Sequence, residues 1–206
     1  MALSKSAATR QRILDAAAGA FREKGYAAAR LVDIAAAAGT KAGSMYYHFD
    51  SKNQLLEEVL KRGLRRVSEA VRKRVAGLPP QASHRTRLEV AIEAHLGFIL
   101  RYDDYASANI RLFGQMPAAI RRRHIRKHRV YAGFWRGLLE AAQTAGEIRG
   151  DVDLSLARLS LFGMMNWSLE WYRPGRLGIA ELAANMCGTL FDGIALKPPA
   201  GSTSGR

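Results

Sequence analysis

Residues 33–52 read DIAAAAGTKAGSMYYHFDSK, which is the pattern of two short helices joined by a glycine turn. The first helix is expected over about 32–38 and ends at Gly39, and the second is expected over about 40–48. Two short helices joined in this way, packed on a third, form the layout of a helix-turn-helix. The stretch therefore predicts a small helical unit near the start of the chain.

Amphipathic patterns flank this stretch on both sides. Upstream, Thr9 can cap a helix that ends at Gly25 and whose apolar face is Ile13, Leu14, Ala17, Ala18 and Phe21. Downstream, Ser51 and Gln54 have the spacing of a capping box and open a long helix. Its apolar positions at helical spacing are Leu55, Leu56, Val59, Leu60, Leu64, Val67, Val71 and Val75.

Glycine and proline divide the rest of the chain into five further helices. The breaks fall at 77–80, 114–117, 146–150 and 173–176. They leave helices at about 85–102, 105–113, 118–145, 154–172 and 179–195. No segment is a confident strand, so we predict an all-α fold of about nine helices. Its parts are a helix-turn-helix domain over 1–54, a larger helical domain over 55–197 for effector binding and dimerisation, and a tail over 198–206 whose composition predicts disorder.

Charge, cysteine content and apolar runs indicate the kind of partner and the cellular location of the protein. The chain of 206 residues carries a formal net charge of +14, which suggests an anionic partner. Residues 61–130 hold 17 Lys and Arg against 5 Asp and Glu, a net charge of +12, whereas residues 1–60 hold 8 against 6. The one cysteine, Cys187, excludes an intrachain disulfide. With no secretion signal and no membrane-length apolar run, we expect a cytoplasmic protein that does not contact membranes.

The second short helix has side chains suited to DNA. Gly43 and Ser44 are small, so a helix that carries them can enter the major groove closely. Tyr46, Tyr47 and His48 place hydroxyl and imidazole groups together, and groups of this kind bind phosphate oxygens and groove edges. Lys41 and Lys52 add positive charge at the two ends, so the residues alone predict a DNA-reading surface. The alternative is that these aromatic residues are only the edge of a core.

Residues 9–60 resemble the N-terminal domain of the TetR family of bacterial regulators. The resemblance implies that Ser44, Tyr46, Tyr47, His48 and Lys52 contact DNA. It places Ala42 and Gly43 nearest the base edges, and Met45 and Phe49 in the core. The matching features are Ile13-Leu14-Asp15-Ala16-Ala17, Phe21, Lys24-Gly25-Tyr26, Asp33-Ile34-Ala35, Ala38-Gly39 and the run from Gly43 to Lys52.

The chain departs from the family before each short helix. Ala29-Arg30 and Thr40-Lys41 stand where relatives usually have Ser or Thr and Val-Ser. Arg30 and Lys41 can replace a phosphate contact of the missing hydroxyl but not its helix cap, a loss of about 1 kcal/mol per helix. We therefore add Arg30, Thr40 and Lys41 to the predicted DNA-binding set.

The last two helices combine large apolar residues with small ones. The small residues are Ala157, Ser160, Gly163, Ala183, Ala184 and Gly188. Small residues permit close helix packing, either within the chain or between two copies. The family resemblance implies a twofold dimer through helices 154–172 and 179–195, a palindromic operator and repression of transcription.

The segment from Met164 to Arg173 predicts an effector pocket or an ordinary core. Its Met and Trp residues suit an apolar ligand, with Arg173 as a polar anchor. The expected contacts are Phe98, Tyr102, Phe113, Met164, Trp167, Trp171 and Arg173. The segment is similar to TetR-type repressors of lipid and steroid breakdown, several of which are released by acyl-CoA thioesters. The basic run 121–129 suits the phosphates of such a ligand, but it can equally be a solvated face or attract DNA.

Two other classes of function are alternatives to a DNA-binding regulator. An enzyme needs a nucleophile with a base, paired carboxylates or metal ligands, and no such motif is present, so we predict neither catalysis nor a cofactor. The His124/His128 pair lies among cations that would repel a metal ion. A helical ligand carrier or interaction protein that does not bind DNA remains the alternative, and the stretch 38–52 argues against it.

Overall fold

The computed structural model describes residues 4–101 and 104–193, and within them it has only helices. The prediction of an all-α fold is confirmed. Tyr102 and the tail 198–206 lie outside the described residues. The elements are α1 (Lys5–Ala28), α2 (Leu31–Ala37), α3 (Ala42–His48), α4 (Lys52–Ala76), α5 (His84–Leu100), α6 (Asp104–Arg111), the 3-10 turn η1 (Phe113–Gln115), α7 (Ala118–Thr144), α8 (Leu154–Trp171) and α9 (Ile179–Asp192).

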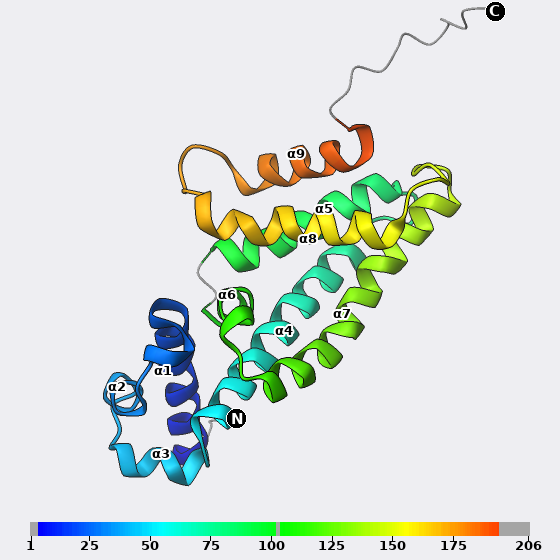
Figure 1. The fold of residues 1–206 in the computed structure, drawn as a ribbon. Coiled ribbons are helices and arrows are strands. Elements are labelled where there is room, and N and C mark those ends of the chain that lie inside the picture. Colours follow the sequence, from blue (N-terminus) through cyan, green and yellow to red (C-terminus); the bar gives the residue numbers. More distant parts are fainter. Residues whose placement is uncertain (1–3, 102–103, 194–206) are drawn as a thin grey trace, which may run out of the picture.

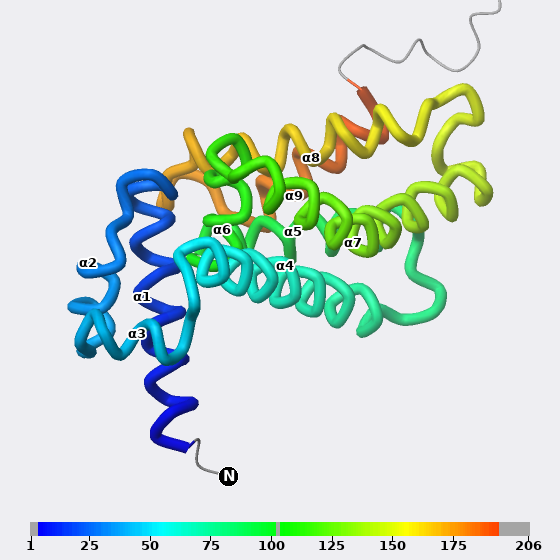
Figure 2. Tube along the Cα trace, turned by 60° about the horizontal axis from the view of Figure 1, so that its bottom comes forward, coloured from blue at the N-terminus to red at the C-terminus, as the bar shows by residue number. Residues whose placement is uncertain are grey.

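Helices α1 to α3 form a small unit at one end of the molecule (Figure 1). From this unit α4 runs beside α7 toward the other end, where α5, α8 and α9 lie together (Figures 1 and 2). The buried apolar residues form two clusters, and α4 belongs to both, through Leu55 to Leu60 in one and Leu64 to Val75 in the other. The domain boundary predicted at 54 thus falls where α4 begins, and this helix connects the two parts.

Helix ends follow the local chemistry of the chain. Ser4, and not Thr9, caps α1, since the Ser4 hydroxyl accepts a hydrogen bond from the Ala7 amide at 3.2 Å. Gly25 has φ 75°, which kinks α1 at its predicted end. Ser51 caps α4, because its hydroxyl accepts from the Gln54 amide at 3.1 Å.

Helix α6 packs tightly on α4 and also reaches α1. A Cβ atom at Gly63 would overlap with the backbone carbonyl of Tyr105, so the two helices cross at a position where only glycine fits. The Tyr105 hydroxyl donates to Asp15 of α1 at 2.7 Å. Arg22 of α1 forms an ion pair with Asp104 at 2.9 Å. The helical unit at the N-terminal end is therefore held to the larger part through α6.

None of the described helices is both long and apolar enough to cross a lipid bilayer.

Candidate nucleic-acid interface and effector cavity

Helix α3 has one buried side and one side in solvent. Met45 and the following Phe49 are buried in the N-terminal cluster, as predicted. On the other side, Tyr46 is 60% exposed and Tyr47 is 82% exposed. The Tyr47 ring packs edge-on against His48, with 5.2 Å between the ring centroids. The outward face of α3 therefore carries two phenol hydroxyls and an imidazole on a fixed support.

The turn between α2 and α3 is held by backbone bonds alone. Gly39 has φ 62° and donates to the carbonyl of Ala36 at 3.0 Å, and Thr40 donates to that of Ala35 at 3.0 Å. Neither Arg30 before α2 nor Lys41 before α3 makes a side-chain cap bond, as the sequence indicated. The first amides of α3 are thus not capped by a protein side chain, and backbone amides at a helix N-terminus suit a phosphate group.

The predicted DNA-binding residues lie on α3, just before α2 and α3, and at the start of α4. Most of them are exposed, and Thr40, Ala42, His48 and Lys52 are partly buried. Lys52 also has a partner inside the chain, because its ammonium donates to the carbonyl of Ala27 at 3.2 Å and lies 4.5 Å from the centre of the Tyr26 ring. Partial burial lowers the pKa of Lys52. Lys52 therefore helps to fix the start of α4 against α1 as well as facing the surface.

A cavity of about 590 Å³ lies inside the larger part. It is enclosed by α4, α5, α6, η1, α7 and α8. Apolar side chains make up most of its wall, among them Leu64, Val67, Ile99 and Phe162. Phe113, Ile125, Arg129 and Leu159 line it and are exposed, so the cavity opens between η1, α7 and α8. Its size and lining are those of a small-molecule site.

Polar groups are set into this apolar wall. The His95 ring stacks on Tyr131, and its Nδ1 lies 2.8 Å from the Tyr131 hydroxyl. Burial lowers the pKa of His95 to about 4. The pKa of His124 is also lowered to about 4, by burial and then by the neighbouring charges of His128 and Lys127. Both imidazoles are therefore neutral at pH 7.

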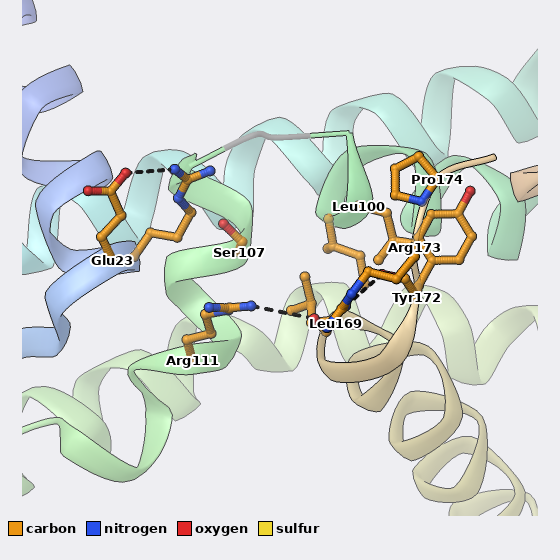
Figure 3. A pocket seen from close by; sticks show the side chains of 10 residues that line it. Glu23, Leu100, Ser107, Arg111, Leu169, Tyr172, Arg173 and Pro174 are labelled. Carbon is orange, nitrogen blue, oxygen red and sulfur yellow. Dashed lines mark hydrogen bonds and ion pairs between the residues drawn. The ribbon is translucent and has the colours of Figure 1, made fainter. Parts of the chain in front are cut away.

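The structure separates the residues that we expected to contact an effector. Phe113 lines the cavity. Phe98 lines a different groove between α4 and α5, and Arg173 lines a third groove, of about 330 Å³, at the end of α8. Figure 3 shows this third groove, where the Arg173 guanidinium donates to the carbonyls of Glu170 and Tyr172. Met164 is half-buried and packs against the core.

Trp167 and Trp171 point away from the cavity, contrary to our expectation. Trp167 is 67% exposed, and Trp171 is also exposed. The residues of α8 that line the cavity are Arg158, Leu159, Phe162 and Asn166. The two tryptophans continue an outward stripe with Leu156, Ser160 and Gly163, because these positions recur every three or four residues along one helix face. The pocket residues predicted on α8 are thus corrected to a different face of the same helix.

Four polar residues that line the cavity were not among the predicted effector contacts, and each comes from a different helix. His95 is on α5, Asn109 on α6, His124 on α7 and Asn166 on α8. One signal was available: His95 interrupts an otherwise apolar face of α5. Over the part of the chain with assigned structure, no three His, Cys, Asp or Glu side chains come together as a metal site.

These features define a class of protein. A helix-turn-helix with an outward polar helix, joined by one long helix to an all-helical part with an internal cavity, is the arrangement of a ligand-responsive DNA-binding regulator. Residues 13–59 match the model of bacterial regulatory proteins of the tetR family, and residues 81–194 match that of the tetracyclin repressor-like C-terminal domain. The chain belongs to the TetR family of transcriptional regulators.

Relatives and solved structures agree with this assignment. The chain is 31% identical to the HTH-type transcriptional repressor KstR2 of Rhodococcus jostii over 196 residues, which cover 90% of this chain and 91% of that protein. It is 28% identical to KstR2 of Mycolicibacterium smegmatis, with 94% and 91% covered. The crystal structure of AibR in complex with isovaleryl coenzyme A and operator DNA has a TM-score of 0.79 and 26% identity, with 89% and 98% covered. The relatives are regulators, not enzymes.

Proposed function

We propose that the chain is a homodimeric repressor that binds a palindromic operator through α3 and releases it when a small molecule enters the cavity. The observation that carries this proposal is the outward face of α3, where Tyr46 and Tyr47 stand in solvent above buried Met45 and Phe49. Neighbouring exposed aromatic side chains form an apolar patch, and such patches often mark an interaction surface. Relatives named as repressors support the direction of control. A bacterial regulator that acts on chromosomal DNA belongs in the cytoplasm.

We assign the contacts on the DNA by position. Ala42, Gly43 and Ser44 at the start of α3 approach the base edges, and the exposed Tyr47 reaches the adjoining backbone. Arg30, Thr40, Lys41 and Lys52 flank this contact and bind phosphates. The remaining predicted DNA-binding residues, Tyr46 and His48, lie beside Tyr47 on the same helix. In a twofold dimer the two copies of α3 would lie about 34–36 Å apart, to enter successive major grooves.

The dimer is proposed to form through α8 and α9. On α8 the stripe of Leu156, Ser160, Gly163, Trp167 and Trp171 is an apolar face with small residues at its centre. On α9 the outward residues include Ala180 and Ala184. A second copy of the same two helices would cover this face in a four-helix interface, with the small residues allowing close approach.

The effector is proposed to be an acyl-CoA thioester. Arg122, Arg126 and Arg129 lie on the face of α7 that carries Ile125, and both Ile125 and Arg129 line the open side of the cavity. Among the described residues none of the three has a carboxylate within 4.0 Å, whereas Arg123 is paired with Glu57. Free guanidinium groups next to an apolar cavity suit a ligand with phosphates at one end and an acyl chain at the other. The AibR complex contains such a thioester.

Effector and operator would be coupled through α4 and α6. Both helices line the cavity, and both contact α1. We expect the effector to bind more tightly to a conformation in which the two copies of α3 have a different separation. The largest possible loss of operator affinity then equals the ratio of the effector's affinities for the two conformations.

Operator binding by the whole protein tests the proposal. We expect the DNA upstream of its own coding sequence to bind at least about a thousandfold more tightly than a scrambled fragment at physiological salt. The affinity should fall steeply as salt rises, and acyl-CoA thioesters should lower it. Lys41→Ala should reduce by about one the slope of the logarithm of the binding constant against the logarithm of the salt concentration. The exposed control Arg136→Ala on α7 should leave this slope unchanged. No binding of either fragment at low salt would favour the alternative, a helical ligand carrier or interaction protein that does not bind DNA.

A further inference from the structure

The wall of the cavity contains buried polar atoms without hydrogen-bond partners. They are Nε2 of His95, Oδ1 of Asn109, Nε2 of His124 and Oδ1 of Asn166, in the part of the chain that the structure describes. His95, Asn109 and His124 are more than nine-tenths buried. A buried polar atom without a partner costs free energy, so native proteins rarely keep several of them in one place unless a ligand or water completes the set.

The chemistry of these atoms determines what can complete them. The Asn109 amide nitrogen donates to the Tyr105 carbonyl at 2.7 Å, which orients its Oδ1 as the free atom. A carboxamide oxygen only accepts hydrogen bonds, so its partner must carry a donor hydrogen. The Nε2 atom of a neutral imidazole either donates or accepts, according to the tautomer. A group that both donates and accepts therefore matches the set better than a carbonyl, which only accepts.

The inner part of the cavity, around His95 and His124, disfavours an ionic partner. Burial lowers the pKa of His95 to about 4, and Asn166 only partly opposes this effect. The pKa of His124 is likewise about 4, through burial and nearby positive charge. Neutral imidazoles give little attraction to a carboxylate, and carboxamide oxygens would repel it. The arginines at the open side are where an anion is favoured, so the inner group is neutral.

We propose that the effector carries a hydroxyl, which binds among His95, Asn109, His124 and Asn166 while the apolar part of the effector contacts the apolar wall. This inference rests on the proposal that an effector occupies the cavity. It makes the site selective, because a plain acyl chain would leave the polar atoms of the wall without partners.

Two matched pairs of probes test this inference on the full-length protein by calorimetry. The first pair is octanoyl-CoA and 8-hydroxyoctanoyl-CoA, and the second is cyclooctane and cyclooctanol. Cyclooctane is the more hydrophobic of its pair, so an apolar cavity would prefer it. We expect the hydroxylated member of each pair to bind about tenfold more tightly, as for one added hydrogen bond to a buried group.

Substitutions test which residues cause the preference for the hydroxylated probe. Asn166→Leu and His124→Phe should bring the ratio of the two affinities to about one, whereas His84→Phe, at the start of α5 and away from the cavity, should keep it. A ratio is insensitive to a loss of folded protein. The Oδ1 atom of Asn166 has no hydrogen-bond partner to lose among the described residues, so the Asn166 variant should fold even if that of His124 does not.

The outcomes separate this inference from the proposed function. If thioesters bind but the plain chain is equal or better, the hydroxyl inference is overturned and the thioester effector stands. If only cyclooctanol is preferred and no thioester binds, the inference stands and the thioester proposal fails. If none of the four probes binds, both are overturned.

Discussion

Tyr47 is the residue whose substitution should separate DNA binding from folding. Its side chain is 82% exposed and its ring packs edge-on against His48, so Tyr47→Ala removes little packing. We expect operator affinity to fall by about 1–3 kcal/mol, the usual value of one good contact in the groove. The measurements are fluorescence anisotropy with operator DNA and thermal unfolding.

Tyr47→Phe divides this effect between ring and hydroxyl. An affinity like that of the wild type would assign the contact to the ring, and one like that of Tyr47→Ala would assign it to the hydroxyl. A large drop in melting temperature with unchanged operator affinity would instead place Tyr47 in the core and contradict the interface.

The buried histidines should make stability depend on pH. Their pKa in the folded chain is about 4 for both His95 and His124, below the value of about 6.5 for a free imidazole. The unfolded chain therefore binds more protons between these values, so the free energy of unfolding falls as pH decreases from about 6.5 to about 4. Each histidine should contribute about 1–2 kcal/mol of this loss between pH 7 and pH 5. Urea unfolding at the two pH values measures it.

His124→Phe is the test variant for this effect, since it removes one titrating group and keeps a ring. The variant should lose less stability than the wild type between pH 7 and pH 5. Identical losses would show that His124 is not buried in neutral form.

At the level of elements, the crossing of α4 and α6 should be the least tolerant contact. Gly63→Ala places a methyl group against the backbone of Tyr105, which can move only by separating the helices. We expect a loss of about 1–3 kcal/mol or more in the free energy of unfolding. The same change at Gly97 in α5 meets no atom within 4 Å and should stabilise the helix by up to about 1 kcal/mol. If both variants unfolded alike in urea, the close crossing would be refuted.

Helix positions could be predicted from the sequence because the helices end at residues whose own chemistry stops or caps a helix. Pro79 and Pro80 cannot continue α4, Gly146 has φ 76°, and Ser51 supplies a cap, so these ends were predicted to within a few residues. Thr9 was wrong as the first cap because both Thr9 and Ser4 satisfy the local pattern. The choice between them depends on how far helix propagation continues toward the start of the chain.

The exposed face of α3 was predictable because its residues are contiguous, whereas the cavity was not. Its polar residues come from four helices, and only the packing brings them together. Trp167 and Trp171 were expected in a pocket because a large apolar residue gives the same sequence signal in a core, in a pocket and on an outer face. Met165 and Ser168 of the same helix are buried instead. Successive residues of a helix are rotated by about 100°, and composition alone does not say which face of the helix is turned inward.

At the scale of the whole molecule, Trp167 should control oligomeric state. Trp167→Glu puts a charge in the centre of the proposed α8–α9 face, where a dimer would bury it without a partner. We expect a dimer to become a monomer at micromolar concentration, as measured by sedimentation equilibrium, with operator affinity strongly reduced. Val130→Glu is the matched control, because Val130 is 72% exposed on α7, away from this face. A dimer that survives Trp167→Glu and dissociates in Val130→Glu would place the interface elsewhere.

The central claim is that two copies of α3 read one operator. Hydroxyl-radical footprinting on the DNA upstream of the coding sequence tests it most directly. We expect two symmetric protected patches whose centres are separated by about one helical turn, 10–10.5 base pairs, or by a whole number of turns. A single unpaired patch, or no protection at a concentration that saturates the dimer, would contradict it.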